Sequence, residues 1–139
     1  MAQAFLVGRI LVGGYYLFMA FHHFTDTAAL TRYAAMHGVP APQVAVIVGG
    51  LLLAIAGISL ILGLYPSVGV ASLVLFLVPV TVMMHPFWAD RDPGMQQMDM
   101  VNFSKNIGLL GSSLMFLAIP RPWPYSVERR VRIPVCATV

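Results

Sequence analysis

Residues 44–64, VAVIVGGLLLAIAGISLILGL, decide the fold class of this 139-residue chain because they contain no charged side chain. A helix needs about 20 apolar residues to cross the hydrocarbon core of a bilayer, and this stretch is long enough. A helix of a soluble bundle would carry a polar outer face, and this stretch has none. The stretch therefore predicts a membrane-spanning helix.

The rest of the chain has the same character. It is 59% hydrophobic and 9% charged, with a mean hydropathy of +0.84, whereas soluble domains contain about 25% charged residues. Three further segments approach the length of a membrane span, although the last is short unless its helix begins near Asn102. These segments are residues 4–21, 68–84 and 107–119.

Between the first two apolar segments, residues 27–36 are expected to form a short helix at the membrane interface. Gly38 and Pro40 would stop it. The prediction for the whole chain is all-α: an integral membrane four-helix bundle with one short interfacial segment.

Basic residues predict the orientation of this bundle. Four spans place both termini on one side, and only Lys and Arg count in the positive-inside rule. The tail contains more Lys and Arg residues than the loops on the opposite side, which favours N-in/C-in. We expect a membrane domain at residues 1–120 and a basic cytoplasmic tail at 121–139. The residues compared are Arg121, Arg129, Arg130 and Arg132 against Arg32, Arg91 and Lys105.

Polar residues gather at one face of the predicted bundle. The first and third helices run the same way, so their C-terminal ends emerge together, and the fourth helix starts from that face. All four histidines are expected there, at the periplasmic face in this orientation. The residues concerned are His22, His23, His37, His85, Trp88, Asn102, Lys105 and Asn106.

Arg9 lies inside the first apolar segment, where an arginine costs roughly 2.5–3.5 kcal/mol at the membrane centre. Counting by three and four places it on one helix face with Gly13, Tyr16, Ala20 and His23. Two interpretations remain open. The side chain extends to the inner headgroups, or it faces the bundle as an anion anchor or as the partner of another polar group.

The histidines also allow two interpretations. A histidine at a helix C-terminus packs favourably against the helix dipole, and Trp88 is typical of an interfacial anchor. Metal binding by His22, His23 and His85 is a weak alternative, because no HExxH or CxxC motif is present. A single axial ligand to a tetrapyrrole is another weak alternative.

The start of the fourth helix offers hydrogen bonds to a ligand. Asn side chains donate and accept, and Lys donates, so Asn102, Lys105 and Asn106 could hold a carbonyl, a quinone oxygen or an oxyanion. No nucleophile with a base and an orienting group is evident, so catalysis by the chain alone is not expected. Three acidic residues are interpreted as solvated loop charges: Asp90, Asp92 and Asp99.

Small residues predict where helices approach closely, because lipid offers no hydrophobic drive for association. One set lies on the second membrane helix and another on the fourth. These are Gly50, Ala54 and Gly57, and then Gly108, Gly111 and Ser112.

Two motifs, HPFW at residues 85–88 and NFSKN at 102–106, accompany an early Arg9 and a G-x(5)-G-L-Y pattern at 57–65. Together they resemble the DoxX-like family of bacterial inner-membrane proteins over about residues 5–119. The resemblance implies a multi-pass four-helix bundle in the inner membrane. Some such relatives are small subunits of thiosulfate:quinone oxidoreductases, and others are linked to complexes that handle thiol or oxidative stress.

The resemblance and the residues together give a functional hypothesis. The chain is a small membrane subunit of a redox-associated complex, and any enzymatic role is that of an accessory subunit of a quinone-linked oxidoreductase. It would hold a quinone or another lipophilic ligand. The alternative is a structural subunit of a larger complex with a His-ligated pigment or haem. Expected partners are membrane lipids and other subunits, not nucleic acid. The predicted ligand-binding residues are Arg9, Tyr16, His23, His85, Trp88, Asn102, Lys105 and Asn106.

Overall fold

The computed structural model describes residues 1–131; Arg132 and the last seven residues of the predicted tail, 133–139, lie outside the described residues. The described chain is helical and contains no strand, as the all-α prediction requires. Four helices are long and the others are short. They are α1 (Ala2–Thr25), α2 (Thr27–Met36), α3 (Pro42–Leu62), α4 (Pro66–Met84), α5 (Pro93–Met115), the 3₁₀ turn η1 (Phe116–Ala118) and α6 (Val127–Val131).

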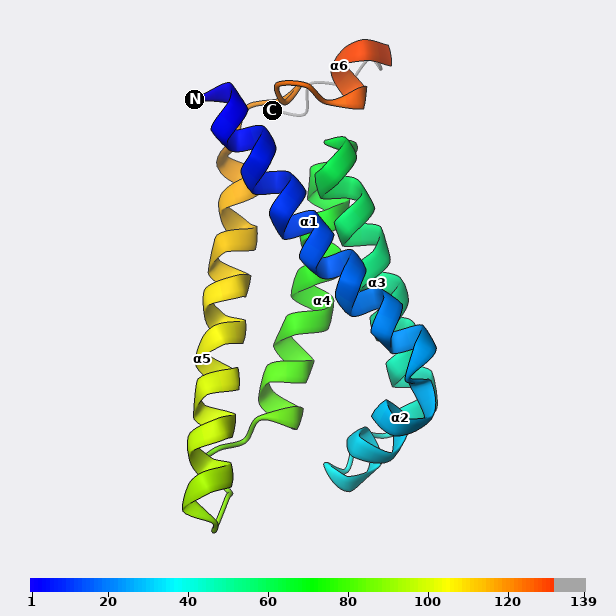
Figure 1. Ribbon diagram of the computed structural model, residues 1–139, viewed down its shortest axis with the longest axis vertical. Helices are drawn as coiled ribbons and strands as arrows, with labels where there is room; N and C mark the ends of the chain where they lie inside the picture. Colours follow the sequence, from blue (N-terminus) through cyan, green and yellow to red (C-terminus); the bar gives the residue numbers. More distant parts are fainter. Residues whose placement is uncertain (132–139) are drawn as a thin grey trace.

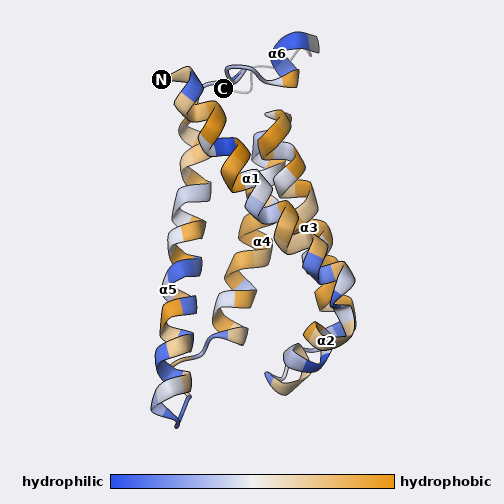
Figure 2. Cartoon of the chain, in the orientation of Figure 1, coloured by the Kyte–Doolittle hydropathy of each residue, from blue (hydrophilic) through white to orange (hydrophobic). Residues whose placement is uncertain are grey.

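Three helices of the described chain are long and apolar enough to cross a membrane. They are α1, α3 and α4, with 24, 21 and 19 residues. α5 has 23 residues, but its first half contains the polar stretch that ends in NFSKN. Figure 2 shows this difference as blue segments along the lower half of α5, whereas α3 and α4 are mostly orange and tan. A fourth crossing by α5 therefore stays a prediction.

The long helices form an open arc. α3 packs against α1 on one side and α4 on the other, and α5 packs against α4. In Figure 1, α1 crosses diagonally in front of α3, and α5 diverges from α1 toward the lower end of the molecule. α2 also packs on α3 at that lower end. The arc thus leaves its lower half open between α5 and the α1–α2 hairpin.

Prolines begin three of the long helices. Pro42, Pro66 and Pro93 occupy the first turns of α3, α4 and α5, where the missing N–H leaves no helical hydrogen bond unmade. α5 is also capped by Asp92, whose Oδ1 accepts from the Met95 amide at 2.9 Å. The expected start of this helix, near Asn102 or later, is wrong because a strong cap lies well upstream of its apolar half.

The predicted inward face of α1 is confirmed. The buried residues of this helix are Arg9, Gly13, Tyr16 and Ala20, and their spacing follows the helical repeat. The Tyr16 hydroxyl lies 3.2 Å from Ser113 Oγ, which connects α1 to α5 inside the bundle. This contact links the two outer helices of the arc.

Glycines bring α1 and α3 into backbone contact. A Cβ added to Gly13 would lie 2.9 Å from the Gly57 carbonyl oxygen, and one added to Gly57 would lie 2.8 Å from that of Gly13. The predicted packing role of Gly57 is therefore confirmed. In contrast, a Cβ at Gly108 or Gly111 would meet nothing within 4 Å. The packing expected of these two α5 glycines is not made within the described chain.

Arg9 faces the protein interior and binds the segment after α5. Its side chain is 1% exposed, and Nη2 donates to the Tyr125 carbonyl at 2.7 Å. The guanidinium carbon lies 6.0 and 5.9 Å from the ring centroids of Phe5 and Trp123, within cation–π range. Extension of Arg9 to the headgroups is therefore the wrong alternative. Nε and Nη1 have no acceptor among residues 1–131.

The segment after α5 folds back over this end of the helices. Trp123 is fully buried, with its ring centroid 5.1 Å from that of Phe5 and 5.5 Å from that of Phe116. Arg121 Nη2 donates to Glu128 Oε1 at 2.7 Å and Nε donates to Oε2 at 3.2 Å. The described part of the tail is thus packed on the helical body.

Gly13→Ala should destabilise the protein, and the neighbouring Gly14→Ala should not. The new methyl at position 13 would strike the Gly57 backbone and Ile61 side chain, whereas the methyl at Gly14 would enter open space. Overpacking of this kind costs about 1–3 kcal/mol, and a surface change stays within about 0.5 kcal/mol. Unfolding in detergent measures both, and equal losses would contradict the packing described.

Arg9→Met should release the segment after α5. The change removes a charged hydrogen bond of the kind that contributes about 1.5–3 kcal/mol, so trypsin should cut after Arg129 and Arg130 about tenfold faster. Arg91→Met, at an exposed loop position, is the control. Mass spectrometry of the cleavage products gives the rates, and no difference between the variants would show that Arg9 does not hold the tail.

Candidate functional site

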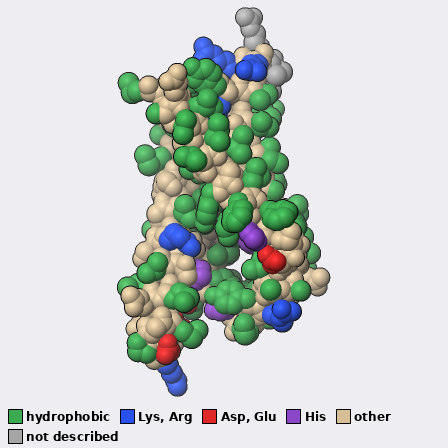
Figure 3. Space-filling model, viewed as in Figure 1, with side chains coloured by type: hydrophobic (Ala, Val, Ile, Leu, Met, Phe, Trp, Pro, Cys, Tyr) green, Lys and Arg blue, Asp and Glu red, His purple; other side chains and the backbone are tan. Residues whose placement is uncertain are grey.

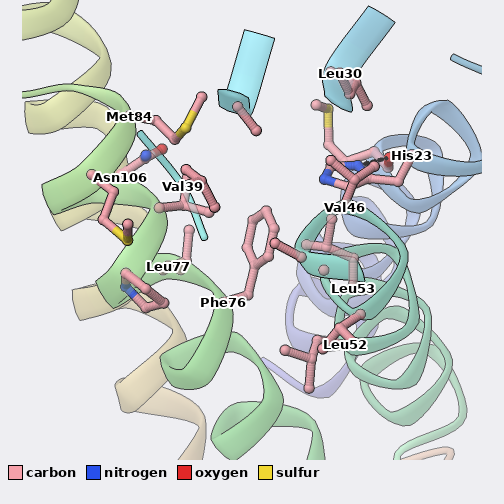
Figure 4. A pocket seen from close by; sticks show the side chains of 18 of the residues that line it. His23, Leu30, Val39, Val46, Leu52, Leu53, Phe76, Leu77, Met84 and Asn106 are labelled. Carbon is pink, nitrogen blue, oxygen red and sulfur yellow. Dashed lines mark hydrogen bonds between the residues drawn. The ribbon is translucent and has the colours of Figure 1, made fainter. Parts of the chain in front are cut away.

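A cavity of about 540 Å³ occupies the open half of the arc. It is lined by α1, α3 and α4, by α2 and the loop that follows it, and by Lys105, Asn106 and Leu109 near the middle of α5. In Figure 3 the lower half of the molecule is hollowed, with histidine side chains around the hollow. The walls are mainly apolar. In Figure 4, Val46, Leu52 and Leu53 lie together on one side, and Phe76 projects from α4 between the two sides.

Five of the eight predicted ligand-binding residues line this cavity. They come from three different elements and lie far apart in the sequence. In Figure 4, Asn106 and Met84 lie on one side of the cavity and His23 lies on the other. The five are Tyr16, His23, His85, Lys105 and Asn106.

The other three predicted residues lie elsewhere. Arg9 is at the opposite end of α1, beneath the segment after α5. Trp88 is 57% exposed and stacks edge-on against Phe87 and Phe103 at 5.2 and 5.8 Å. Asn102 does not line the cavity, but its Oδ1 accepts from Lys105 Nζ at 3.0 Å. It therefore orients a cavity residue.

His85 is held by a carboxylate. Its Nδ1 lies 3.1 Å from Asp99 Oδ1, and the two side chains are 14% and 9% exposed. The interpretation of Asp99 as a solvated loop charge is wrong, because this residue lies within α5 and points into the protein. Asp92 is exposed as expected and Asp90 is half-buried. The pair joins the end of α4 to α5.

His23 is held by its own helix. Its Nδ1 lies 2.9 Å from the Met19 carbonyl oxygen, and its ring centroid lies 5.6 Å from that of Phe76 in an edge-on contact. Both cavity histidines therefore use Nδ1 for an internal hydrogen bond. Only the opposite nitrogen, Nε2, is left for a ligand.

Tyr33 of α2 adds a phenol to the cavity wall. Burial raises the pKa of this phenol, and the negative charges of Asp99 and Asp90 raise it further. The hydroxyl keeps its proton at neutral pH, so it can donate a hydrogen bond.

The histidines are not arranged as a metal site in the described chain. Residues 1–131 contain no group of three His, Cys, Asp or Glu side chains that could hold an ion. His22, the third member of the weak metal alternative, pairs with Asp26 at 2.8 Å and does not line the cavity. Its side chain is 40% exposed.

Two comparisons place the chain among known proteins. The profile of the DoxX family matches residues 4–86, which is more than half of the chain. The inner membrane protein YphA of Escherichia coli (strain K12) is 27% identical over 125 residues, which cover 90% of this chain and 88% of that protein. No solved structure gives a significant match. The chain belongs to the DoxX family and is a protein of the bacterial inner membrane.

Proposed function

We propose that this protein is a small membrane subunit of a redox-associated complex and that it holds a quinone or another lipophilic ligand in the cavity. The observation that carries this proposal is the cavity itself, which has apolar walls and a polar lower end. Its volume of about 540 Å³ falls within the range of roughly 300–1,000 Å³ typical of ligand pockets.

The distribution of side chains fits a ligand with a long apolar part and a polar head. Leu52, Leu53 and Phe76 offer aliphatic and aromatic contact to the apolar part. Lys105 and Asn106 offer hydrogen bonds at the polar end. Asn106 is only 7% exposed, so a hydrogen bond to its amide would be shielded from water.

In this proposal the chain binds and orients the carrier, and partner subunits exchange electrons with it. We place the polar end at the periplasmic face and both termini in the cytoplasm, with α5 as the fourth crossing and residues 121–139 as the cytoplasmic tail. The basic residues of the tail support this orientation.

Leu52→Trp should displace the ligand, and Leu51→Trp should leave it bound. Leu52 lines the cavity, whereas its neighbour Leu51 is 51% exposed and lies outside it.

Asn106→Leu should weaken binding by removing hydrogen bonds at the polar end, by about tenfold for one lost bond. The measurement is mass spectrometry of lipophiles that co-purify with each variant from its own membrane.

The outcomes separate the two hypotheses. A quinone-sized species that is lost in Leu52→Trp and kept in Leu51→Trp supports the proposal. Equal amounts of ligand in native protein and both tryptophan variants would refute the assignment of this cavity. A haem or pigment absorbance band that disappears in His85→Phe would instead favour the structural subunit with a His-ligated pigment.

A further inference from the structure

We infer that the cavity selects a lipophile that carries a hydroxyl group, such as a quinol or another long-chain phenol, over its carbonyl or ether counterpart. This inference rests on the proposed function, because it names the chemical class of ligand for the same cavity. It follows from the hydrogen bonds that the two cavity histidines already make.

Asp99 determines which nitrogen of His85 can accept. An ionised carboxylate has oxygens that only accept hydrogen bonds, so the contact of 3.1 Å between Asp99 Oδ1 and His85 Nδ1 places the proton on Nδ1. In a neutral imidazole the other nitrogen, Nε2, then carries a lone pair. His85 therefore presents an acceptor to a ligand.

His23 also carries its proton on Nδ1, because of a different hydrogen-bond partner. The Met19 carbonyl oxygen, 2.9 Å from His23 Nδ1, also only accepts, so it too requires the proton on Nδ1. His23 lies across the cavity from Asn106 (Figure 4). Acceptor nitrogens are thus supplied from both α1 and the end of α4.

A hydroxyl group satisfies this arrangement better than a carbonyl does. Its proton can be donated to a histidine Nε2 while its oxygen accepts from Lys105 or Asn106. A carbonyl or ether oxygen can accept from those donors but leaves the histidine acceptors unpaired. An unsatisfied buried group of this kind weakens binding by roughly tenfold or more.

The test uses two probes that differ only at this group: 4-nonylphenol and its methyl ether. Binding of each to the full-length protein in detergent is measured at pH 8, where an ordinary imidazole is neutral. The phenol should bind about tenfold more tightly than the ether. Reduced and oxidised decylubiquinone form a second pair, and the reduced form should bind more tightly.

Variants assign the preference to the two histidines. His85→Phe and His23→Phe should each reduce the phenol-to-ether ratio. Asp99→Asn should also reduce it, because the carboxamide can donate to Nδ1 and so move the His85 proton to Nε2. His37→Phe is the matched control: its Nδ1 makes the same kind of bond, 3.0 Å to the Tyr33 carbonyl, but it does not line the cavity.

Three results would overturn the inference. Equal binding of phenol and ether by the native protein removes the hydroxyl preference and leaves the proposed lipophile site standing. A preference that survives in His85→Phe, His23→Phe and Asp99→Asn assigns it to other groups. Failure of the native protein to bind any of the four probes refutes the proposed function as well. Because three separate variants are used, misfolding of one still leaves the assignment testable.

Discussion

A polar group among apolar membrane helices is stabilised by partners within the protein, because lipid supplies no hydrogen bonds. This constraint shapes both ends of the molecule. At one end, buried Arg9 donates to the Tyr125 carbonyl and draws the segment after α5 over the helices. At the other end, Asp99 holds His85 and joins α5 to α4. Between them, the Tyr16 hydroxyl lies 3.2 Å from Ser113 Oγ and links α1 to α5.

The cavity follows from the same arrangement. Facing glycines bring α1 and α3 into backbone contact, whereas α5 packs mainly against α4 rather than against α1 or α3. The lower half of the arc therefore stays open, and the side chains that border it already have their inner hydrogen bonds made. Such a site would be preorganised for the proposed ligand, since binding would not first break those bonds.

The sequence predicts those parts of the fold that local signals determine, namely which face of a helix is buried and where a short helix ends. The inward face of α1 and the bounds of α2 are as expected, because a 3.6-residue repeat and Gly38 determine them. The start of α5 was missed, since polar residues conceal a helix that the Asp92 cap begins. The burial of Trp123 depends on contacts with Phe5 and Phe116, which no local pattern reveals.

The candidate site, like the fold, could be predicted only in part from the sequence. Asp99 and Asn106 are seven residues apart, two helical turns, so a longer α5 would have placed both on one face. Arg9 and His23 lie on the predicted face of α1 but far apart along the helix. Fourteen residues separate them, about 21 Å at 1.5 Å per residue. A shared face therefore does not make a shared site.

The most direct test is an experimental structure of the protein in nanodiscs formed with lipids from its own membrane. We expect ligand density in the cavity, with a ring near Phe76 and a polar atom within hydrogen-bond distance of His85 Nε2. A collapsed cavity, or one filled by an ordinary acyl chain with no polar atom near His85, would contradict it.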